Sequence, residues 1–168
     1  APTILELAGL KRSPTFQGKS FAKMLANTNM ETRNYIFAEH NWHDYKAHER
    51  AIRSHRYLYI RNAFPKLNAT PPADAVQSIT YQKMIDMYQA GELNCNQLDC
   101  FIQPRPSEEL YDVIEDPYQL TNLAENPDYA EILNEMRHLL DDWVVEFDDE
   151  IPQNPTPDKF DRWTGKKL

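Results

Sequence analysis

One apolar stripe with helical spacing constrains the C-terminal third of this sequence. Apolar and aromatic residues recur every three or four positions from Tyr129 to Phe147, and acidic residues occupy the positions between them. Asn126 is a suitable N-cap, and Pro127 suits the first helical position. The pattern predicts a helix over 127–147 that packs one face on a sheet and turns the other to water.

Runs of aromatic and β-branched residues predict the sheet itself. Strands are expected over Tyr35–His40, Arg56–Arg61 and Glu109–Val113, with a further short strand at Ala51–Arg53. We therefore predict an α+β fold, in which a small antiparallel β-sheet of about four strands packs against the long amphipathic C-terminal helix.

Other segments are predicted from capping and turn residues. Helices are expected over Pro2–Leu7, Ser20–Leu25 and Ala73–Ala90, the last closed by Gly91. The proline-rich residues 151–168 are expected to form an extended tail, anchored by Phe160 and Trp163.

Composition and charge exclude several classes of protein. The 168 residues are 41% hydrophobic and 26% charged, which is typical of one globular domain, and no apolar run is long enough to span a bilayer. The net charge of −8 argues against nucleic-acid binding, which needs a basic surface. Two cysteines do not make a disulfide framework.

The charge is unevenly distributed along the chain. Twelve acidic residues and one basic residue, Arg137, lie between Glu115 and Glu150, whereas five basic residues and three histidines lie within 43–61. A local basic, histidine-rich stretch in an acidic protein indicates either an anion-binding segment or a solvated strand face.

The densest group of chemically active side chains lies within 39–53, and three interpretations remain open for it. A transition-metal site would use the imidazoles and carboxylate of His40, His43, Asp44 and His48. An anion-binding loop would use the histidines with the forked donors of Arg50 and Arg53, while Trp42 and Tyr45 stack on a sugar. The third interpretation is an ordinary polar loop.

The residues contain no complete catalytic set. Cys95 and Cys100 lie in a polar loop, where they form either a small disulfide or two free thiols. A glycine-rich phosphate loop and a Gly-x-Ser-x-Gly nucleophile elbow are both missing from the sequence.

A long motif in residues 109–124 resembles the C-terminal signature of type I sulfatases. It reads ELYDVIEDPYQLTNLA, close to the family pattern ELYDLxxDPxExxNLA. Residues 1–9, 17–21, 35–40, 50–53 and 56–61 are similar to the family segments that precede this signature. The loop at His40–Asp44 and the segment Ser13–Gln17 resemble the heparan N-sulfatase (sulfamidase) branch.

The resemblance implies a C-terminal portion of a sulfatase that hydrolyses sulfate esters or N-sulfate groups of glycosaminoglycan-type saccharides. Residues 1–30 would end the catalytic α/β domain, 31–150 would form the C-terminal subdomain, and 151–168 the tail. A parent enzyme of this family uses calcium and a formylglycine residue. The run from Cys100 to Arg105 places Pro and Arg one position too late for the formylglycine motif, so no catalytic residue and no metal ligand is assigned here, and the chain alone is predicted to be inactive.

The family places this subdomain beside the mouth of the active site, which implies substrate-binding residues in this chain. The candidates are His40, His43, Asp44, Arg50 and Arg53. The expected partners are a sulfated saccharide and the missing N-terminal catalytic domain, in a periplasmic, secreted or lysosomal-type compartment. Two alternatives remain: a stand-alone module that binds anionic saccharides, and a fragment of a related phosphodiesterase or phosphonate hydrolase.

Overall fold

The computed structural model describes all residues, 1–168. Close backbone contacts divide the chain into two compact units, Ala1–Ile36 and Phe37–Leu168. Each unit has its own short-range packing.

The first unit contains two short helices, α1 (Pro2–Leu7) and α2 (Ala22–Ala26). The buried Thr3 accepts a hydrogen bond through Oγ1 from the backbone N–H of Phe21 at 3.1 Å, which joins the start of α1 to the start of α2. The apolar side chains of Ile4 and Leu7 are exposed to solvent. The helix predicted over Pro2–Leu7 is confirmed.

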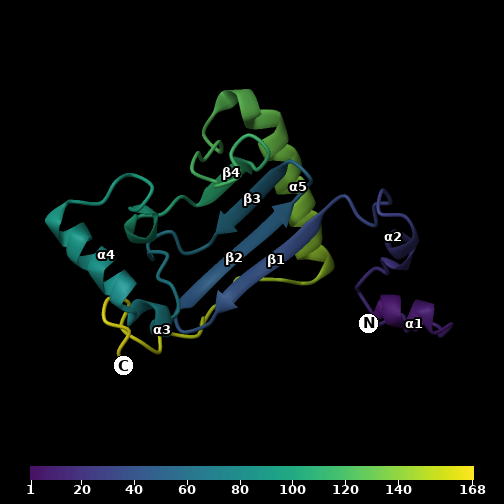
Figure 1. Cartoon of the computed structure of the whole chain (residues 1–168), viewed down its shortest axis with the longest axis horizontal. Helices are drawn as coiled ribbons and strands as arrows, with labels where there is room; N and C mark the ends of the chain where they lie inside the picture. The colour runs from purple at the N-terminus through teal and green to yellow at the C-terminus, as the bar shows by residue number, and fades with distance from the viewer. The chain divides into compact units, whose positions relative to one another are not determined.

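The second unit is built on one four-stranded antiparallel sheet (Figure 1). Its strands are β1 (Ile36–Trp42), β2 (Lys46–Arg53), β3 (Tyr57–Asn62) and β4 (Glu108–Asp112), in the order β1-β2-β3-β4. Tyr59 on β3 pairs with Ile52 on β2 and with Leu110 on β4, and all three side chains are fully buried. This row of apolar side chains forms the centre of the face that the long helix covers.

The long helix α5 (Ala130–Glu146) lies across one face of the sheet (Figure 1). Its apolar stripe is buried at Leu133, Met136 and Leu140. The Trp143 ring stacks on Phe37 of β1 with 5.3 Å between ring centroids. The predicted α+β fold, an antiparallel sheet of four strands against a C-terminal helix, is confirmed.

The structure corrects the bounds of three predicted elements. The short strand expected at Ala51–Arg53 extends back to Lys46, because its polar residues find partners on both faces of the sheet. The helix expected over Ala73–Ala90 is interrupted, since Ser78 caps a new helix by accepting a hydrogen bond from the N–H of Tyr81 at 3.2 Å. The two pieces are α3 (Ala73–Val76) and α4 (Ile79–Ala90). Residues Pro127–Tyr129 form a 3₁₀ turn, η2, before α5.

The tail packs against α4 and the 3₁₀ turn η1 (Asp99–Phe101). The Trp163 ring stacks on Tyr88 of α4 and on Phe101 of η1, with centroid distances of 5.9 and 6.0 Å. Phe160 pairs with Lys167 in an isolated β-bridge and packs on the same apolar cluster. The tail is therefore held in place by the aromatic residues that the sequence singles out.

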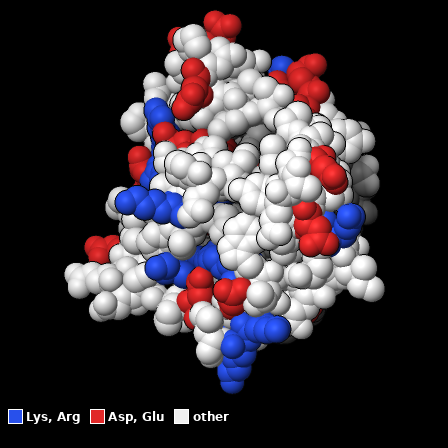
Figure 2. Space-filling view, turned by 90° about the vertical axis from the view of Figure 1, so that its left-hand side faces the viewer, with Lys and Arg blue, Asp and Glu red and all other residues white.

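Acidic and basic side chains are interspersed on the face that contains α4 and the tail (Figure 2). No large surface of a single charge is visible on that face. None of the helices in residues 1–168 has the length and apolar character needed to cross a bilayer.

Candidate functional site

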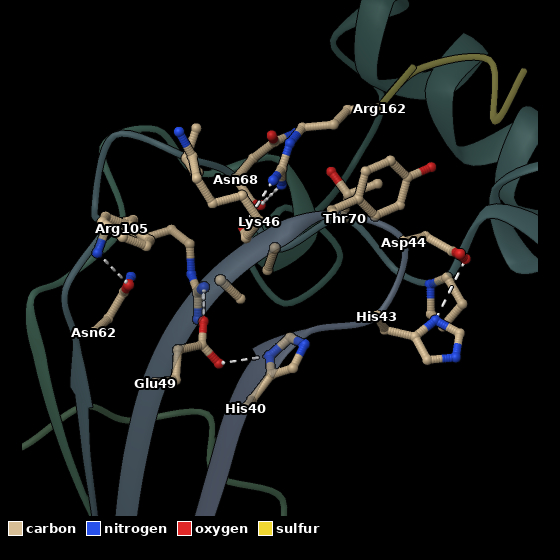
Figure 3. A pocket seen from close by; sticks show the side chains of 16 residues that line it. His40, His43, Asp44, Lys46, Glu49, Asn62, Asn68, Thr70, Arg105 and Arg162 are labelled. Atoms are coloured by element: carbon tan, nitrogen blue, oxygen red, sulfur yellow. Dashed lines mark hydrogen bonds and ion pairs between the residues drawn. The ribbon is translucent and has the colours of Figure 1, made fainter. Parts of the chain in front are cut away.

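A cavity of about 160 Å³ lies beside the turn that connects β1 to β2 (Figure 3). Polar side chains from several distant segments line it, and Figure 3 labels His40, His43, Asp44, Lys46, Glu49, Asn62, Asn68, Thr70, Arg105 and Arg162. We call this cavity the hairpin pocket. All of its lining belongs to the second unit.

Asp44 anchors the turn at the mouth of the pocket. Its Oδ2 accepts a hydrogen bond from the backbone N–H of Ala73 at 2.8 Å and lies 3.3 Å from Nδ1 of His43. Its backbone carbonyl accepts a hydrogen bond from the N–H of Lys159 at 2.9 Å. Because Asp44 joins the turn to α3 and the tail, the exposed imidazole of His43 stands on a fixed backbone.

One wall of the pocket carries a chain of charged side chains. Oε1 of Glu49 accepts a hydrogen bond from Nη1 of Arg105, and Oε2 of Glu49 lies 3.4 Å from Nδ1 of His40. Burial alone would raise the pKa of Glu49, but Arg105 and His40 outweigh it and hold that pKa below its ordinary value. Glu49 is therefore a carboxylate at neutral pH, and it orients His40 toward the cavity.

Arg162 fastens the opposite wall. Its guanidinium donates to both carboxylate oxygens of Asp158, at 2.7 and 3.0 Å. It also donates to the backbone carbonyls of Asn68 and Lys46, each at 2.9 Å. One side chain thus joins the tail to β2 and to the loop that follows β3. All three nitrogens of its guanidinium donate hydrogen bonds in these contacts.

The structure brings together three of the five predicted substrate-binding residues. His40, His43 and Asp44 line the hairpin pocket. Arg50 lies on the other face of the sheet, where it is buried and donates to both oxygens of Asp149. Arg53 is exposed at the opposite end of β2 and does not line the pocket.

Other pocket residues are missing from the sequence-based prediction. They are Lys46, Glu49, Asn62, Asn68, Thr70, Arg105 and Arg162. Most of them come from segments far from the turn in sequence, so spacing offers no signal that they share a cavity. Lys46 and Glu49 are the exceptions, because both lie within the stretch 39–53 that the sequence singles out.

A second cavity, of about 420 Å³, lies along β4 and the loops on either side of it. Arg105 lines both cavities, and its Nη2 lies 3.6 Å from Oε1 of Glu109. Tyr111 donates its hydroxyl to Oε2 of Glu109 at 2.8 Å. Burial is the main reason that the pKa of Glu109 is raised above its ordinary value. A polar chain from His40 to Tyr111 therefore connects the two cavities.

The residues of this chain do not fit a metal centre or a formylglycine site. No group of three or more His, Cys, Asp or Glu side chains is arranged to hold a metal ion in residues 1–168. Cys95 and Cys100 are not joined by a disulfide in the structure. The hairpin pocket is suited to binding through hydrogen bonds and charge, and its lining includes no cysteine or serine.

Comparison with known proteins shows that the chain is similar to sulfatases. The chain is 35% identical over 169 aligned residues to an ulvan-active sulfatase of Formosa agariphila, covering 98% of this chain and 28% of that protein. A second ulvan-active sulfatase of the same organism is 29% identical over 91% of this chain and 29% of its own length. A Delta 4,5-hexuronate-2-O-sulfatase of Bacteroides thetaiotaomicron is 49% identical over 26% of this chain and 9% of its own length. No family model matches the sequence.

Solved structures agree in fold. A 2-O GAG sulfatase matches 99% of this chain and 29% of its own length, with a TM-score of 0.58 and 22% identity. A structure in complex with its substrate D-glucosamine-2-N,6-O-disulfate matches 90% of this chain and 24% of its own length, with a TM-score of 0.57 and 18% identity. The chain thus spans less than a third of the proteins it matches. The curated relatives are sulfatases, and this chain matches a C-terminal portion of them.

Proposed function

We propose that this chain is the substrate-contacting C-terminal part of an enzyme that hydrolyses sulfate groups on saccharides. The observation that carries the proposal is the 35% identity to an ulvan-active sulfatase over 98% of the chain. The hairpin pocket supports it, because His40 and His43 present imidazole groups at a cavity whose walls are fixed by Asp44, Glu49 and Arg162. Directional donors on a rigid frame suit the hydroxyl and sulfate oxygens of a sugar.

The reaction itself belongs to the longer protein. We propose that calcium and formylglycine supply the chemistry there, from residues outside 1–168, since no group of side chains in this chain fits either one. This chain would bind and orient the saccharide. Such contacts lower the barrier only as far as they hold the reacting group in position.

We also propose that the sulfate group is linked to the saccharide through oxygen. The names of the curated relatives include a hexuronate 2-O-sulfatase and two ulvan-active sulfatases, which favours an O-sulfate ester on a uronate-containing saccharide. The narrower assignment to the heparan N-sulfatase branch depends only on the loop at His40–Asp44 and the segment Ser13–Gln17. A glycosaminoglycan substrate is supported only by the 2-O GAG sulfatase and the disulfated glucosamine complex, both similar in fold. Neither the stand-alone binding module nor the phosphodiesterase fragment is favoured by these relatives.

The test is a desulfation assay on the longer protein that contains this chain. Matched pairs of O-sulfated and N-sulfated saccharides would be offered, and released sulfate would be measured. We expect turnover of O-sulfated uronate-containing saccharides. Failure to release sulfate from any sulfated saccharide would overturn the proposed function, and turnover confined to N-sulfates would replace the O-ester assignment.

The role of the pocket is tested separately in the same longer protein. We expect His43→Ala to raise KM about tenfold or to change substrate preference, with a smaller effect on kcat, because the imidazole contributes binding. His138→Ala is the matched control, since this exposed histidine lies on α5 and does not line the pocket. Equal kinetics for the two variants on every substrate would remove His43 from the site.

A further inference from the structure

The second cavity, of about 420 Å³, has one wall in the loop that follows β4. Oδ2 of Asp116 accepts hydrogen bonds from the backbone N–H groups of Leu120 and Thr121, at 2.6 and 2.8 Å, and these bonds fix the loop. Tyr118 and Gln119 lie within the loop and line the cavity. Their backbone is therefore held in place before any ligand arrives.

The opposite wall is the turn that precedes η1. The N–H of Gln97 donates to Oδ1 of Asn94, and the N–H of Asn94 donates to Oε1 of Gln97, both at 3.0 Å. Asn96 lies within this turn and Asp99 follows it, and both line the cavity. Two turns with internal hydrogen bonds thus face one another across the cavity.

The polar groups left for a ligand include both donors and an acceptor. Asn96 uses its Oδ1 to accept from Sγ of Cys95 at 3.5 Å, so its amide nitrogen stays available. The amide of Gln119 and the carboxylate of Asp99 form no hydrogen bond within the chain. A hydroxyl group both donates and accepts, whereas an ammonium group only donates and a sulfate or carboxylate only accepts. Hydroxyl groups therefore match this mixed set.

Aromatic and aliphatic side chains form the rim of the cavity. Tyr118 is 82% exposed, and Ile102 and Leu120 are exposed as well. The C–H face of a sugar ring packs on such side chains while its hydroxyls reach polar groups. The lining thus suits a molecule that has one apolar face and several hydroxyls.

The charge of the cavity opposes an anion. Arg105 is the one basic residue of the lining, and it is bonded to Glu49 and lies 3.6 Å from Glu109. Asp99 forms no salt bridge, and burial and then the charges around Glu109, including that of Asp99, raise the pKa of Glu109. Because carboxylates outnumber the guanidinium, a sulfated or uronate unit would be repelled here.

We infer that the second cavity binds an uncharged sugar unit of a saccharide, through the ring of Tyr118 and the polar groups of Asn96, Asp99 and Gln119. That the ligand is a saccharide rests on the proposed function, and that the unit is uncharged rests on the cavity alone. The cavity would therefore favour saccharides that contain both charged and uncharged units.

The experiment is an NMR titration of the full 168-residue chain with sugars that differ in charge. Glucose and galactose are the neutral probes, glucuronate is the anionic probe and glucosamine the cationic probe, all at pH 7 and constant ionic strength. The side-chain amide signals of Asn96 and Gln119 would be followed. We expect saturable shifts with at least one neutral sugar, binding of glucuronate weaker by about threefold or more, and binding of glucosamine no tighter than that of the neutral sugar.

Variants identify the groups that bind. Tyr118→Ala should weaken binding of the neutral sugar about tenfold, because the ring supplies the packing surface. Phe21→Ala is the matched control, since this exposed aromatic residue lies in the first unit and does not line the cavity. Asp99→Asn should tighten glucuronate binding about threefold or more, whereas Asp86→Asn, which removes an exposed charge on α4, should leave it unchanged.

Several outcomes would overturn the inference. They are no saturable shift with either neutral sugar, glucuronate binding as tight as that of the neutral sugar, tighter binding of glucosamine, and equal losses for Tyr118→Ala and Phe21→Ala in chains whose spectra show an intact fold. Sulfate release tests the proposed function separately. Sugar binding with no desulfation by the longer protein would leave the cavity assignment standing and remove the sulfatase proposal, and desulfation without sugar binding here would do the reverse.

Discussion

Arg50 on β2 and Asp149, three residues beyond the end of α5, form a paired contact of two hydrogen bonds. Nη2 of Arg50 donates to Oδ1 of Asp149 at 2.7 Å, and Nε donates to Oδ2. The guanidinium is buried on the sheet face that α5 covers, and His48 lies beside it with Nε2 3.1 Å from Nη2. The end of the long helix is thus fastened to the centre of the sheet by a charged pair.

Removing the acid should destabilise the second unit. Asp149→Asn leaves the buried guanidinium of Arg50 without its carboxylate, and we expect a loss of about 3 kcal/mol in the free energy of unfolding. Urea denaturation at pH 7 measures it. Asp148→Asn, at an exposed neighbouring position, should change the stability by less than about 0.5 kcal/mol. Similar losses for the two variants would contradict a specific role for the pair.

Acidification should weaken the same contact through His48. Burial, and then the charge of Arg50, lower the pKa of His48 below its ordinary value of 6.5. In the unfolded chain His48 therefore binds a proton near pH 6.5, whereas in the folded chain it binds the proton only at lower pH. The free energy of unfolding consequently falls as the pH drops from 6.5 toward the lowered pKa. Denaturation midpoints of wild type and His48→Gln between pH 7 and 5 check this. Gln cannot titrate, so its curve should be flatter, and parallel curves would contradict the role of His48.

The acid of the ELYD motif should stabilise the turn after β4. Oδ2 of Asp112 accepts a hydrogen bond from Nε of Arg56 at 2.7 Å, and Oδ1 accepts from the N–H groups of Ile114 and Glu115 at 3.1 and 3.2 Å. Asp112→Asn should lower the free energy of unfolding at pH 7, because the buried side chain of Asp112 loses the charge that pairs with Arg56. The exposed Glu115, with its Oε1 3.9 Å from Nη2 of Arg56, supplies the control variant Glu115→Gln, which should cost under about 0.5 kcal/mol.

The advantage of the Asp112 carboxylate should disappear in acid. Burial would raise the pKa of Asp112, but Arg56 and the backbone donors outweigh it, so that pKa lies below its ordinary value of 3.8. The stabilisation is therefore present above pH 3.8 and is lost as the pH falls through the lowered pKa. A stability difference between wild type and Asp112→Asn that persisted unchanged in strong acid would point to packing instead of charge.

Arg162 should control how firmly the tail is held. Arg162→Lys keeps the positive charge but cannot reach Asp158, Asn68 and Lys46 together. We expect hydrogen exchange at the backbone amide of Lys46, which donates to Oδ1 of Asp158 at 2.6 Å, to accelerate about tenfold or more. The amides of β3 that pair with β4 should keep their wild-type rates. Equal acceleration throughout the sheet would indicate global destabilisation.

The sequence predicts the layers of the fold well, because apolar periodicity reports burial directly. Tyr59, Ile52 and Leu110 lie in runs that the pattern identifies, and Leu133 to Leu140 follow the expected stripe. The prediction from apolar periodicity fails along most of β2, because the buried side chains there include the polar residues His48 and Arg50. A polar residue is buried only where a partner exists, and Asp149 lies 99 positions away from Arg50.

The candidate site is predictable only where its residues are neighbours in sequence. His40, His43 and Asp44 form one short segment, and their chemistry can be read from it. Arg105 and Arg162 join the pocket through tertiary contacts with Glu49 and with the carbonyl of Lys46. Local spacing contains no information about such contacts.

The tail that closes the hairpin pocket also fixes the order in which the pocket can be completed. Nε1 of Trp42 donates to the carbonyl of Pro157 at 2.9 Å, across 115 positions of the chain. During synthesis the β1–β2 turn leaves the ribosome long before Pro157, Asp158 and Arg162 exist, and the wall that they supply cannot form until translation has passed them. A nonsense codon or a protease cut near residue 151 would therefore leave the sheet and α5 intact in sequence while removing one wall of the pocket.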